Sequence, residues 1–204
     1  QGYSTAFIYG GEAHFDNMRR FFLNNGFQTV IDEKDYVNPK HFGVWGVSDE
    51  DLFDRTHQWM TEKGDQPTFV FLLTSSNHKP FDIPQGKVEP VGGEDGPMET
   101  AVKYADYAMG EFFDYAREAE YWDDTVFLVI ADHNSRVYGD SLVPIDRFQI
   151  PGLILGGGIE PRVIARVSSQ LDMLPTLLSL AGIRATFPAI GRDLTTREYF
   201  DGAG

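Results

Sequence analysis

Two apolar stretches of this sequence each lead into side chains that can bind a metal ion or do acid–base chemistry. Val126–Ile130 is followed by Asp132 and His133, and Phe69–Leu73 is followed five residues later by His78. A carboxylate oxygen and an imidazole nitrogen are suitable ligands for Zn²⁺ or Mn²⁺. The pattern therefore places one candidate ligand pair and one candidate histidine just beyond two buried strands.

The same residues also have plainer interpretations. An aspartate after a strand can form a turn by accepting hydrogen bonds from nearby backbone N–H groups. His78 lies in Asn-His-Lys-Pro, which is also typical of a turn, and His57 lies mid-helix beside Trp59, where a structural role is expected. On the pattern alone, a turn and a functional site both stay open at Asp132 and at His78.

Alternating strand and helix signals predict an α/β fold with a largely parallel sheet. Ligands collect at the carboxyl ends of such strands, so His78 and the Asp132–His133 pair are expected to face one cleft. A long loop is expected over Ser75–Met98, and an irregular tail from Ile183. Strands are expected at Thr5–Tyr9, Phe27–Ile31, Thr68–Thr74, Thr125–Ala131, Gly152–Leu155 and Val163–Val167, and helices at Phe15–Asn25, Ser48–Lys63, Thr100–Ala119 and Leu171–Ala181.

Composition excludes several classes of function. The 204 residues carry a formal net charge of −14, which argues against nucleic acid or anionic lipid as a primary partner. There is no cysteine, so disulfides, thiolate metal sites and a cysteine nucleophile are excluded. No apolar run is long enough to span a membrane. A serine nucleophile elbow, a His-Glu-x-x-His motif and a dinucleotide-binding fingerprint are also missing from the sequence.

Several segments together resemble the sulfatase family of the alkaline phosphatase superfamily. The closer resemblance is to its lipoteichoic-acid-synthase-like members, the phosphoglycerol transferases. It rests on "YGGEAHFDNMRRFFLNNGF", "WGVSDEDLF", "TFVFLLTSSNHKPF", "YADYAMGEFFDYA", "TVFLVIADHNSR", "IPGLILGGG" and "VSSQLDMLPTLLSLAG", in that order. The resemblance implies an alkaline-phosphatase-like three-layer sandwich with a largely parallel central sheet, here N-terminally truncated, with residues 1–204 as the C-terminal portion of a single catalytic domain.

The resemblance also implies roles for the residues already noted. Asp132 and His133 match the pair that binds the catalytic divalent metal, for which Mn²⁺ is the first expectation and Zn²⁺, Mg²⁺ or Ca²⁺ are alternatives. His78 matches a histidine that contacts the transferred phosphate or sulfate. The family's nucleophile and its acidic metal ligand lie upstream of Gly10, so this chain is expected to carry part of the site and to be inactive alone.

A second stretch, Gly10–Asn17, matches the segment that shapes the substrate pocket. Within it Glu12 and His14 are candidate substrate-binding residues. The positions of a tryptophan and an arginine that hold glycerol phosphate in lipoteichoic acid synthases are matched here by Asp16 and Met18, which departs from the family pattern. Arg136 is a further candidate for the cleft, without a motif match.

The resulting hypothesis is metal-dependent transfer or hydrolysis of a phosphate ester through a covalent intermediate on an upstream Thr or Ser. The substrate is expected to be lipid- or glycan-linked, and upstream helices are expected to anchor the protein in the inner membrane with the catalytic domain facing the periplasm or cell exterior. Two alternatives stay open: a true sulfatase or phosphonate hydrolase, and a non-catalytic fragment that binds an anion or a partner and self-associates through an uncovered sheet edge.

Overall fold

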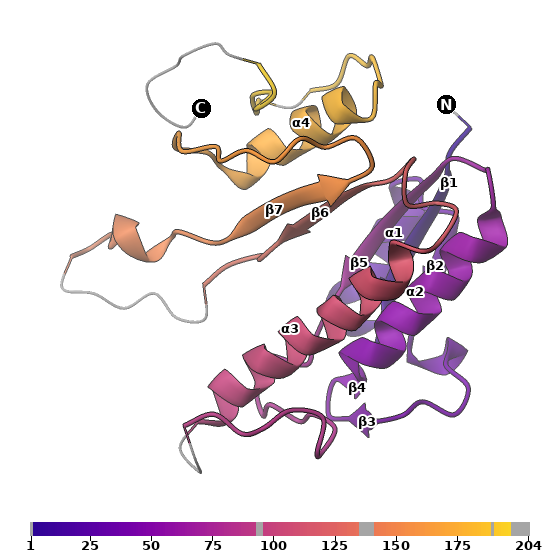
Figure 1. Ribbon diagram of the computed structural model, residues 1–204, viewed down its shortest axis with the longest axis vertical. Coiled ribbons are helices and arrows are strands. Elements are labelled where there is room, and N and C mark those ends of the chain that lie inside the picture. Colours follow the sequence, from indigo (N-terminus) through magenta and orange to yellow (C-terminus); the bar gives the residue numbers. More distant parts are fainter. Residues whose placement is uncertain (1, 93–95, 135–140, 189, 197–204) are drawn as a thin grey trace. The chain divides into compact units, whose positions relative to one another are not determined.

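The computed structural model describes residues 2–92, 96–134, 141–188 and 190–196 (Figure 1). The chain divides into two compact units, Gln1–Trp122 and Asp123–Gly204. Each unit has its own sheet and helices, and each is described by itself.

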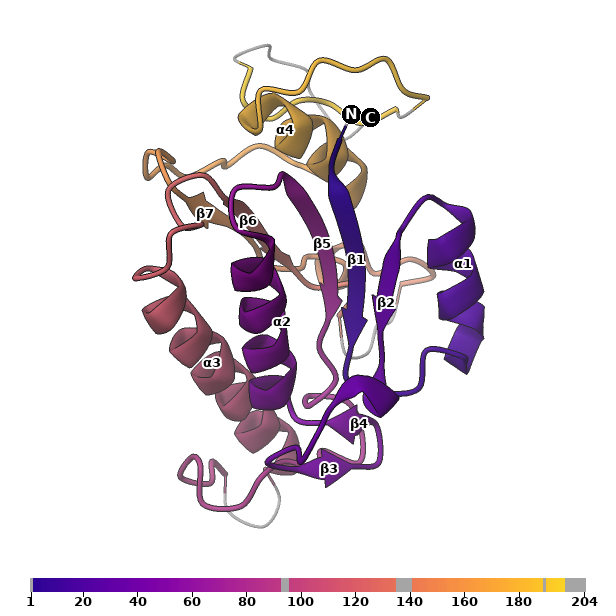
Figure 2. The ribbon, with the colours of Figure 1, turned by 90° about the vertical axis from the view of Figure 1, so that its right-hand side faces the viewer.

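Unit 1 is built on a parallel three-stranded sheet in the order β2-β1-β5 (Figure 2). The strands are β1 (Ser4–Tyr9), β2 (Thr29–Ile31) and β5 (Thr68–Leu73). The central strand β1 is buried along nearly its whole length, and β5 pairs with it from Ser4↔Thr68 to Tyr9↔Leu73. Because β1 and β5 are parallel and end in register, the segments that follow them leave the sheet at the same edge.

One face of this sheet is covered by α1 (Met18–Asn24). Side chains alternate between the two faces of a strand, so Phe7 and Tyr9 of β1 share one face. There the Phe22 ring stacks on the Phe7 ring with centroids 3.8 Å apart, and these residues form the core of this face with Ala13. Aromatic burial of this kind fixes the short helix to the sheet.

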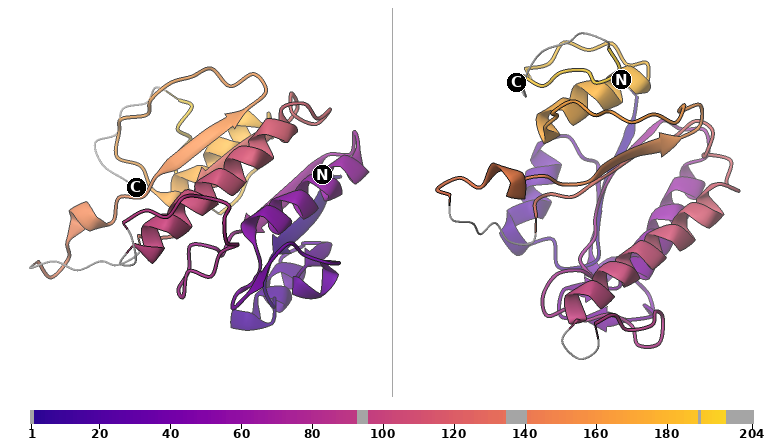
Figure 3. Two further views of the ribbon diagram at one scale, coloured as in Figure 1. Left: turned by 60° about the horizontal axis from the view of Figure 1, so that its bottom comes forward. Right: turned by 60° about the vertical axis from the view of Figure 1, so that its left-hand side comes forward.

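The other face carries α2 (Asp49–Lys63), which contacts both β1 and β5. Figure 3 shows α1 and α2 on opposite faces of the sheet. The longest helix, α3 (Pro97–Ala116), packs along α2, and the rings of Phe53 and Phe112 stack with centroids 5.1 Å apart. Unit 1 therefore has three layers: α1, the parallel sheet and the α2–α3 pair.

A short antiparallel hairpin, β3 (Phe42–Gly43) and β4 (Gly46–Val47), lies at the edge of the sheet where β1 ends. The backbone N–H of Val47 donates to the carbonyl of Gly10, directly after β1 (2.9 Å). Gly46 has φ +100°, and a Cβ on it would lie 2.0 Å from the Gly10 oxygen. Only glycine fits a positive φ and so close an approach. Gly10 and Gly46 thus allow the hairpin to pack closely against the end of the central strand.

Unit 2 contains the antiparallel pair β6 (Val126–Ile130) and β7 (Gly152–Gly156), with α4 (Met173–Leu180) packed against β6. Short 3₁₀ turns occur at Ile145–Arg147 and Gln170–Asp172. Asp172, at the end of the second turn, is 1% exposed and accepts hydrogen bonds from the backbone N–H groups of Ser169 and Arg192, both 2.8 Å.

The main predicted elements are confirmed, with one exception. The predicted strand Val163–Val167 is wrong, because these residues have neither strand nor helix structure. Its three β-branched residues favour a strand, but Val163 is 91% exposed and Val167 is 68% exposed. β-propensity depends on a pairing partner, and no described strand pairs with this segment. The predicted α/β class and the largely parallel main sheet stand.

Candidate functional site

His78 lies five residues beyond β5, where the chain turns away from the edge of the unit 1 sheet. Its ring Nδ1 is 2.9 Å from the carbonyl oxygen of Lys79. A carbonyl can only accept, so Nδ1 carries the proton in this contact and the neutral ring keeps its lone pair on Nε2. His78 can therefore donate from Nε2 to an anion only as the imidazolium.

The turn before His78 is anchored by Asp49, the first residue of α2. One carboxylate oxygen of Asp49 accepts from the backbone N–H groups of Ser75 and Ser76, both at 3.1 Å. The contact is reciprocal, because the Asp49 N–H donates to the Ser76 hydroxyl at 3.0 Å. Burial raises the pKa of the Asp49 carboxyl, against the opposing effect of these hydrogen bonds. The helix start and the end of β5 are thus joined just before His78.

The segment after His78 is held by the β3–β4 hairpin. One Asp82 carboxylate oxygen accepts from the backbone N–H of Val44, and the other lies 3.2 Å from His41 Nε2. The Trp45 indole N–H donates to the Lys79 carbonyl, and the indole ring meets the His78 ring edge-on with centroids 4.4 Å apart. His78 is therefore fixed from both sides.

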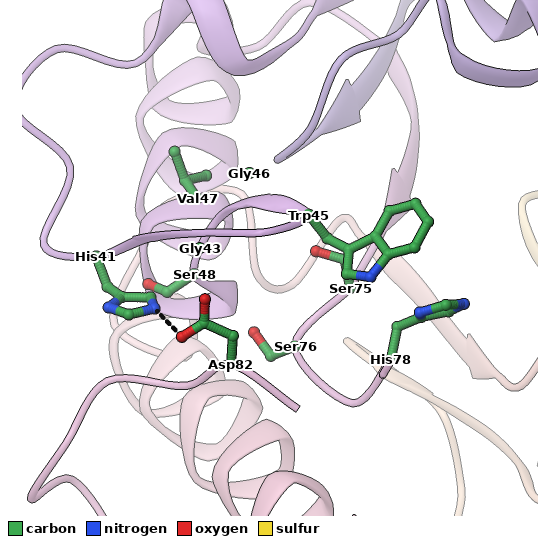
Figure 4. A pocket seen from close by; sticks show the side chains of 10 residues that line it. All are labelled: His41, Gly43, Trp45, Gly46, Val47, Ser48, Ser75, Ser76, His78 and Asp82. Atoms are coloured by element: carbon green, nitrogen blue, oxygen red, sulfur yellow. Dashed lines mark hydrogen bonds and ion pairs between the residues drawn. The ribbon is translucent and has the colours of Figure 1, made fainter. Parts of the chain in front are cut away.

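These contacts surround a small pocket (Figure 4). Its lining combines two imidazoles, an indole, a carboxylate and three hydroxyl groups with glycine backbone, which is a polar surface with one aromatic wall. The lining residues are His41, Gly43, Trp45, Gly46, Val47, Ser48, Ser75, Ser76, His78 and Asp82.

Glu12 and His14 follow the end of β1, so they leave the sheet at the same edge as the His78 segment. Both are exposed, and Lys34 lies 3.9 Å from the Glu12 carboxylate. The Phe15 ring contacts the Trp45 ring edge-on, with centroids 5.5 Å apart. Trp45 consequently touches both the Glu12–Phe15 segment and His78, which links two of the regions predicted to bind substrate.

Asp32 stabilises the Gly10–Asn17 stretch through its ion pair with Arg19. Its carboxylate is 1% exposed and accepts from the Arg19 guanidinium at 2.6 Å. Burial alone would raise the pKa of Asp32, but the Arg19 hydrogen bond and charge and the Lys34 backbone N–H outweigh it, so the pKa is lowered. The backbone N–H of Arg19 donates to the Ala13 carbonyl at 2.8 Å, which ties α1 to the Gly10–Asn17 stretch. The ion pair joins the same arginine to Asp32.

In unit 2, Asp132 and His133 lie directly beyond β6, and their side chains are 74% and 75% exposed. The Nδ1 atom of His133 is 2.8 Å from the Asn134 carbonyl oxygen, so Nδ1 carries a proton, and in the neutral ring the lone pair is on Nε2. Nε2 lies 3.2 Å from an Asp132 carboxylate oxygen. Two electron-rich atoms at that distance need a proton or a cation between them.

This arrangement fits a divalent metal ion. A carboxylate oxygen and an imidazole nitrogen 3.2 Å apart are donor types that a divalent metal such as Mn²⁺ or Zn²⁺ would accept. A ligating histidine with its other nitrogen bonded to a backbone carbonyl is the usual arrangement. Within the described part of the chain, no group of three or more His, Asp or Glu side chains could hold a metal. That this pair binds a metal stays a prediction.

The remaining candidates divide as follows. Arg136 lies outside the described residues. That His78 and the Asp132–His133 pair face one cleft stays a prediction, since they belong to different units. Sequence reasoning missed Asp49, Trp45 and Asp82, whose hydrogen bonds around the His78 segment join residues 26 to 38 positions apart.

The family model for Sulfatase matches residues 1–183. The chain belongs to the Sulfatase family. Among curated Sulfatase relatives, "Phosphoglycerol transferase I" of Xanthomonas euvesicatoria pv. vesicatoria (strain 85-10) is 31% identical over 213 residues, covering 97% of this chain and 30% of the relative. The chain thus spans less than a third of that protein's length.

Solved structures place the fold in the alkaline phosphatase superfamily. A protein of that superfamily from Vibrio parahaemolyticus superposes with a TM-score of 0.94 at 53% identity, over 98% of this chain and 49% of the other. The lipoteichoic acid synthase LtaP from Listeria monocytogenes gives a TM-score of 0.82 at 27% identity, over 95% of this chain and 53% of the other. The predicted family and fold class are confirmed. None of the described helices is long and apolar enough to cross a membrane.

Proposed function

We propose that this protein is part of a metal-dependent enzyme that transfers or hydrolyses a phosphate ester, of the phosphoglycerol transferase or phosphodiesterase type. The observation that carries the proposal is the Asp132–His133 pair, whose donor atoms lie 3.2 Å apart with the tautomer of His133 fixed for ligation through Nε2. The Sulfatase family match and the similarity to phosphoglycerol transferases support it.

Asp132 and His133 would hold the divalent metal, with Mn²⁺ as the first candidate and further ligands from outside these residues. When bound, the metal lowers the pKa of a coordinated hydroxyl and offsets charge on the phosphoryl oxygens. The chain's own contribution is positional: β6 ends at Ile130, two residues before Asp132, so the pair lies just beyond a strand end.

In unit 1, His78 would bind a nonbridging phosphoryl oxygen. Because Nδ1 is committed to the Lys79 carbonyl, Nε2 donates to that oxygen only when the ring is protonated. An imidazolium is a charge-assisted donor and is stronger than a neutral one. Glu12 and His14 would contact the alcohol part of the substrate, since they share the sheet edge with His78.

The proposed reaction is a double displacement. A Thr or Ser hydroxyl from a segment outside these 204 residues attacks phosphorus, and the donor's alcohol leaves with the proton. The oxygen of an acceptor alcohol or water then attacks the same phosphorus, gives up its proton and releases the Thr or Ser hydroxyl. The phosphoryl group is conserved through both steps.

The proposal extends to the substrate and its place in the cell. The substrate would be a lipid- or glycan-linked phosphate ester, and a segment outside these residues would anchor the protein in the membrane with the site facing the periplasm or the cell exterior. Support comes from relatives named for phosphoglycerol and for lipoteichoic acid.

Asp132→Ala in the intact protein tests the assignment. We expect hydrolysis of bis-p-nitrophenyl phosphate in the presence of Mn²⁺ to fall at least about 100-fold, because a metal ligand is lost. Asp124→Ala, which removes an exposed carboxylate just before β6, is the matched control and should keep wild-type activity. Wild-type turnover by Asp132→Ala would refute the metal site, and a preference for p-nitrophenyl sulfate would favour the sulfatase alternative.

A further inference from the structure

The hydrogen-bond ladder of β6 stops short of the residues proposed to bind metal. The last β6 residue paired with β7 is Ile130, opposite Gly152. Asp132 and His133 are therefore beyond the ladder, and their side chains are mostly exposed. The His133 backbone N–H donates to the Asp132 carboxylate at 2.8 Å, which orders the two residues relative to each other. After them, the Asn134 side-chain amide donates to the Arg147 carbonyl at 3.2 Å.

Gln170 connects the backbone at Asp132 itself to the rest of unit 2. Its side-chain amide nitrogen lies 2.9 Å from the carbonyl oxygen of Ala131 and 2.8 Å from that of Asp132. An NH₂ group has two hydrogens, so one amide donates to two successive carbonyls. Gln170 therefore holds the backbone on both sides of the peptide bond that joins Ala131 to Asp132.

Gln170 is itself held in a rigid turn. It opens the Gln170–Asp172 turn, whose buried Asp172 accepts from Ser169 N–H and Arg192 N–H. Burial would raise the pKa of Asp172, but these backbone N–H groups and the Arg192 charge outweigh it and lower the pKa. The Asp172 carbonyl also accepts from the Thr176 hydroxyl at 2.6 Å. The turn is thus fixed to α4, and Gln170 extends from this fixed turn to the backbone just beyond β6.

We infer that Gln170 is a positioning residue for the metal site: its amide sets the position of Asp132 and His133 through their backbone. The inference rests on the proposed metal site. A merely structural role would predict a loss of fold stability, but Gln170 and Asp132 are exposed, so water can replace the amide at both carbonyls. The expected consequence is looser metal ligands in an intact fold, and partners that orient metal ligands typically change affinity about 10- to 100-fold.

Two substitutions in the intact protein test this. Gln170→Ala removes the amide, and Gln170→Glu keeps the length but replaces the donor with an acceptor that repels both carbonyls. Both should weaken Mn²⁺ binding, measured by calorimetry, about 10-fold or more. In metal-free protein, hydrogen exchange of the peptide covering residues 126–134 should quicken about 5-fold, while the melting temperature stays within about 2 °C. Gln149→Ala, at another exposed glutamine of unit 2, is the control and should change neither quantity.

The outcomes separate the inference from the proposed function. Unchanged affinity and exchange in both Gln170 variants would overturn the inference, as would weaker binding that only accompanies a large drop in melting temperature. If the wild-type protein binds no Mn²⁺, the proposed metal site fails. Hydrogen exchange then still tests the contact itself: quicker exchange in the Gln170 variants means that Gln170 holds the backbone beyond β6, and unchanged exchange means that it does not.

Discussion

Asp49 is the residue whose substitution should most directly disturb the His78 segment. Its carboxylate is 1% exposed, and one oxygen accepts two backbone N–H groups at 3.1 Å. Asp49→Ala leaves the N–H groups of Ser75 and Ser76 without that acceptor, at a cost of about 1–3 kcal/mol each. Removing a carboxylate whose other oxygen is buried without a hydrogen-bond partner in the described chain returns about 1–2 kcal/mol. The net expected loss of stability is about 2.5 kcal/mol at the centre of these ranges.

Asp49→Asn separates the hydrogen bonds from the charge. The asparagine oxygen can accept from both N–H groups, and the buried charge is removed, so we expect a loss below about 1 kcal/mol. Urea denaturation followed by tryptophan fluorescence measures both variants. Phosphodiesterase activity of the intact protein should fall about 10-fold in Asp49→Ala, because His78 is no longer held in place, and less than about 3-fold in Asp49→Asn.

The pH dependence gives this prediction a sign. Burial raises the pKa of Asp49 in the folded state above its ordinary value of about 3.9. The unfolded chain therefore loses its proton first as pH rises, and this residue lowers the stability of the wild type between pH 4 and its folded pKa. Asparagine does not titrate, so the stability difference between wild type and Asp49→Asn should move in favour of the variant as pH rises from 4 to 7. A variant as unstable as Asp49→Ala at every pH would refute this reasoning.

Two further predictions concern unit 1. Arg19→Gln should cost about 2 kcal/mol at pH 7, because it leaves the buried Asp32 carboxylate without its cation. The folded pKa of Asp32 is lowered, so its contribution to stability is present above about pH 4 and is lost as pH falls through the folded pKa; a cost that stayed constant down to pH 2 in urea denaturation would contradict the ion pair. Gly46→Ala should destabilise by more than about 3 kcal/mol, since its Cβ would overlap a carbonyl oxygen at 2.0 Å. Gly26→Ala, with a similar positive φ and open space around the Cβ, should cost about 1 kcal/mol, and equal melting temperatures for the two variants would argue against the close approach.

The elements with a strong periodic signal were predictable from the sequence. The continuous apolar runs that became β5 and β6 end within one residue of the predicted ends, and the apolar stripe of α3 predicted a long helix. The predicted start of α3 at Thr100 was late by three residues, because Pro97 occupies the first helical position, where its missing N–H costs nothing. The β3–β4 hairpin was missed, since strands of two residues are too short to show alternation.

The candidate site was predictable in its residue types but not in its supports. His78, Asp132 and His133 follow apolar strands and are therefore visible as local patterns. Asp49 and Gln170 act on backbone groups 26 and 39 residues away. Nothing in the local sequence of either marks that contact, because an aspartate at a helix start and a glutamine in a turn are ordinary choices there. Only the folded chain shows which backbone groups they meet.

The glycine contact at the base of the β3–β4 hairpin has a consequence for how this protein could be re-engineered. Position 46 accepts only glycine, since any side chain there would overlap the Gly10 carbonyl just after the central strand. The connecting residues carry no such limit: Val44 is 68% exposed, and Trp45 beside it forms the aromatic wall next to His78. A library that varies Val44 and Trp45 while keeping the glycine would sample new pocket walls on the same hairpin, and every substitution of Trp45 would also remove its hydrogen bond to the Lys79 carbonyl.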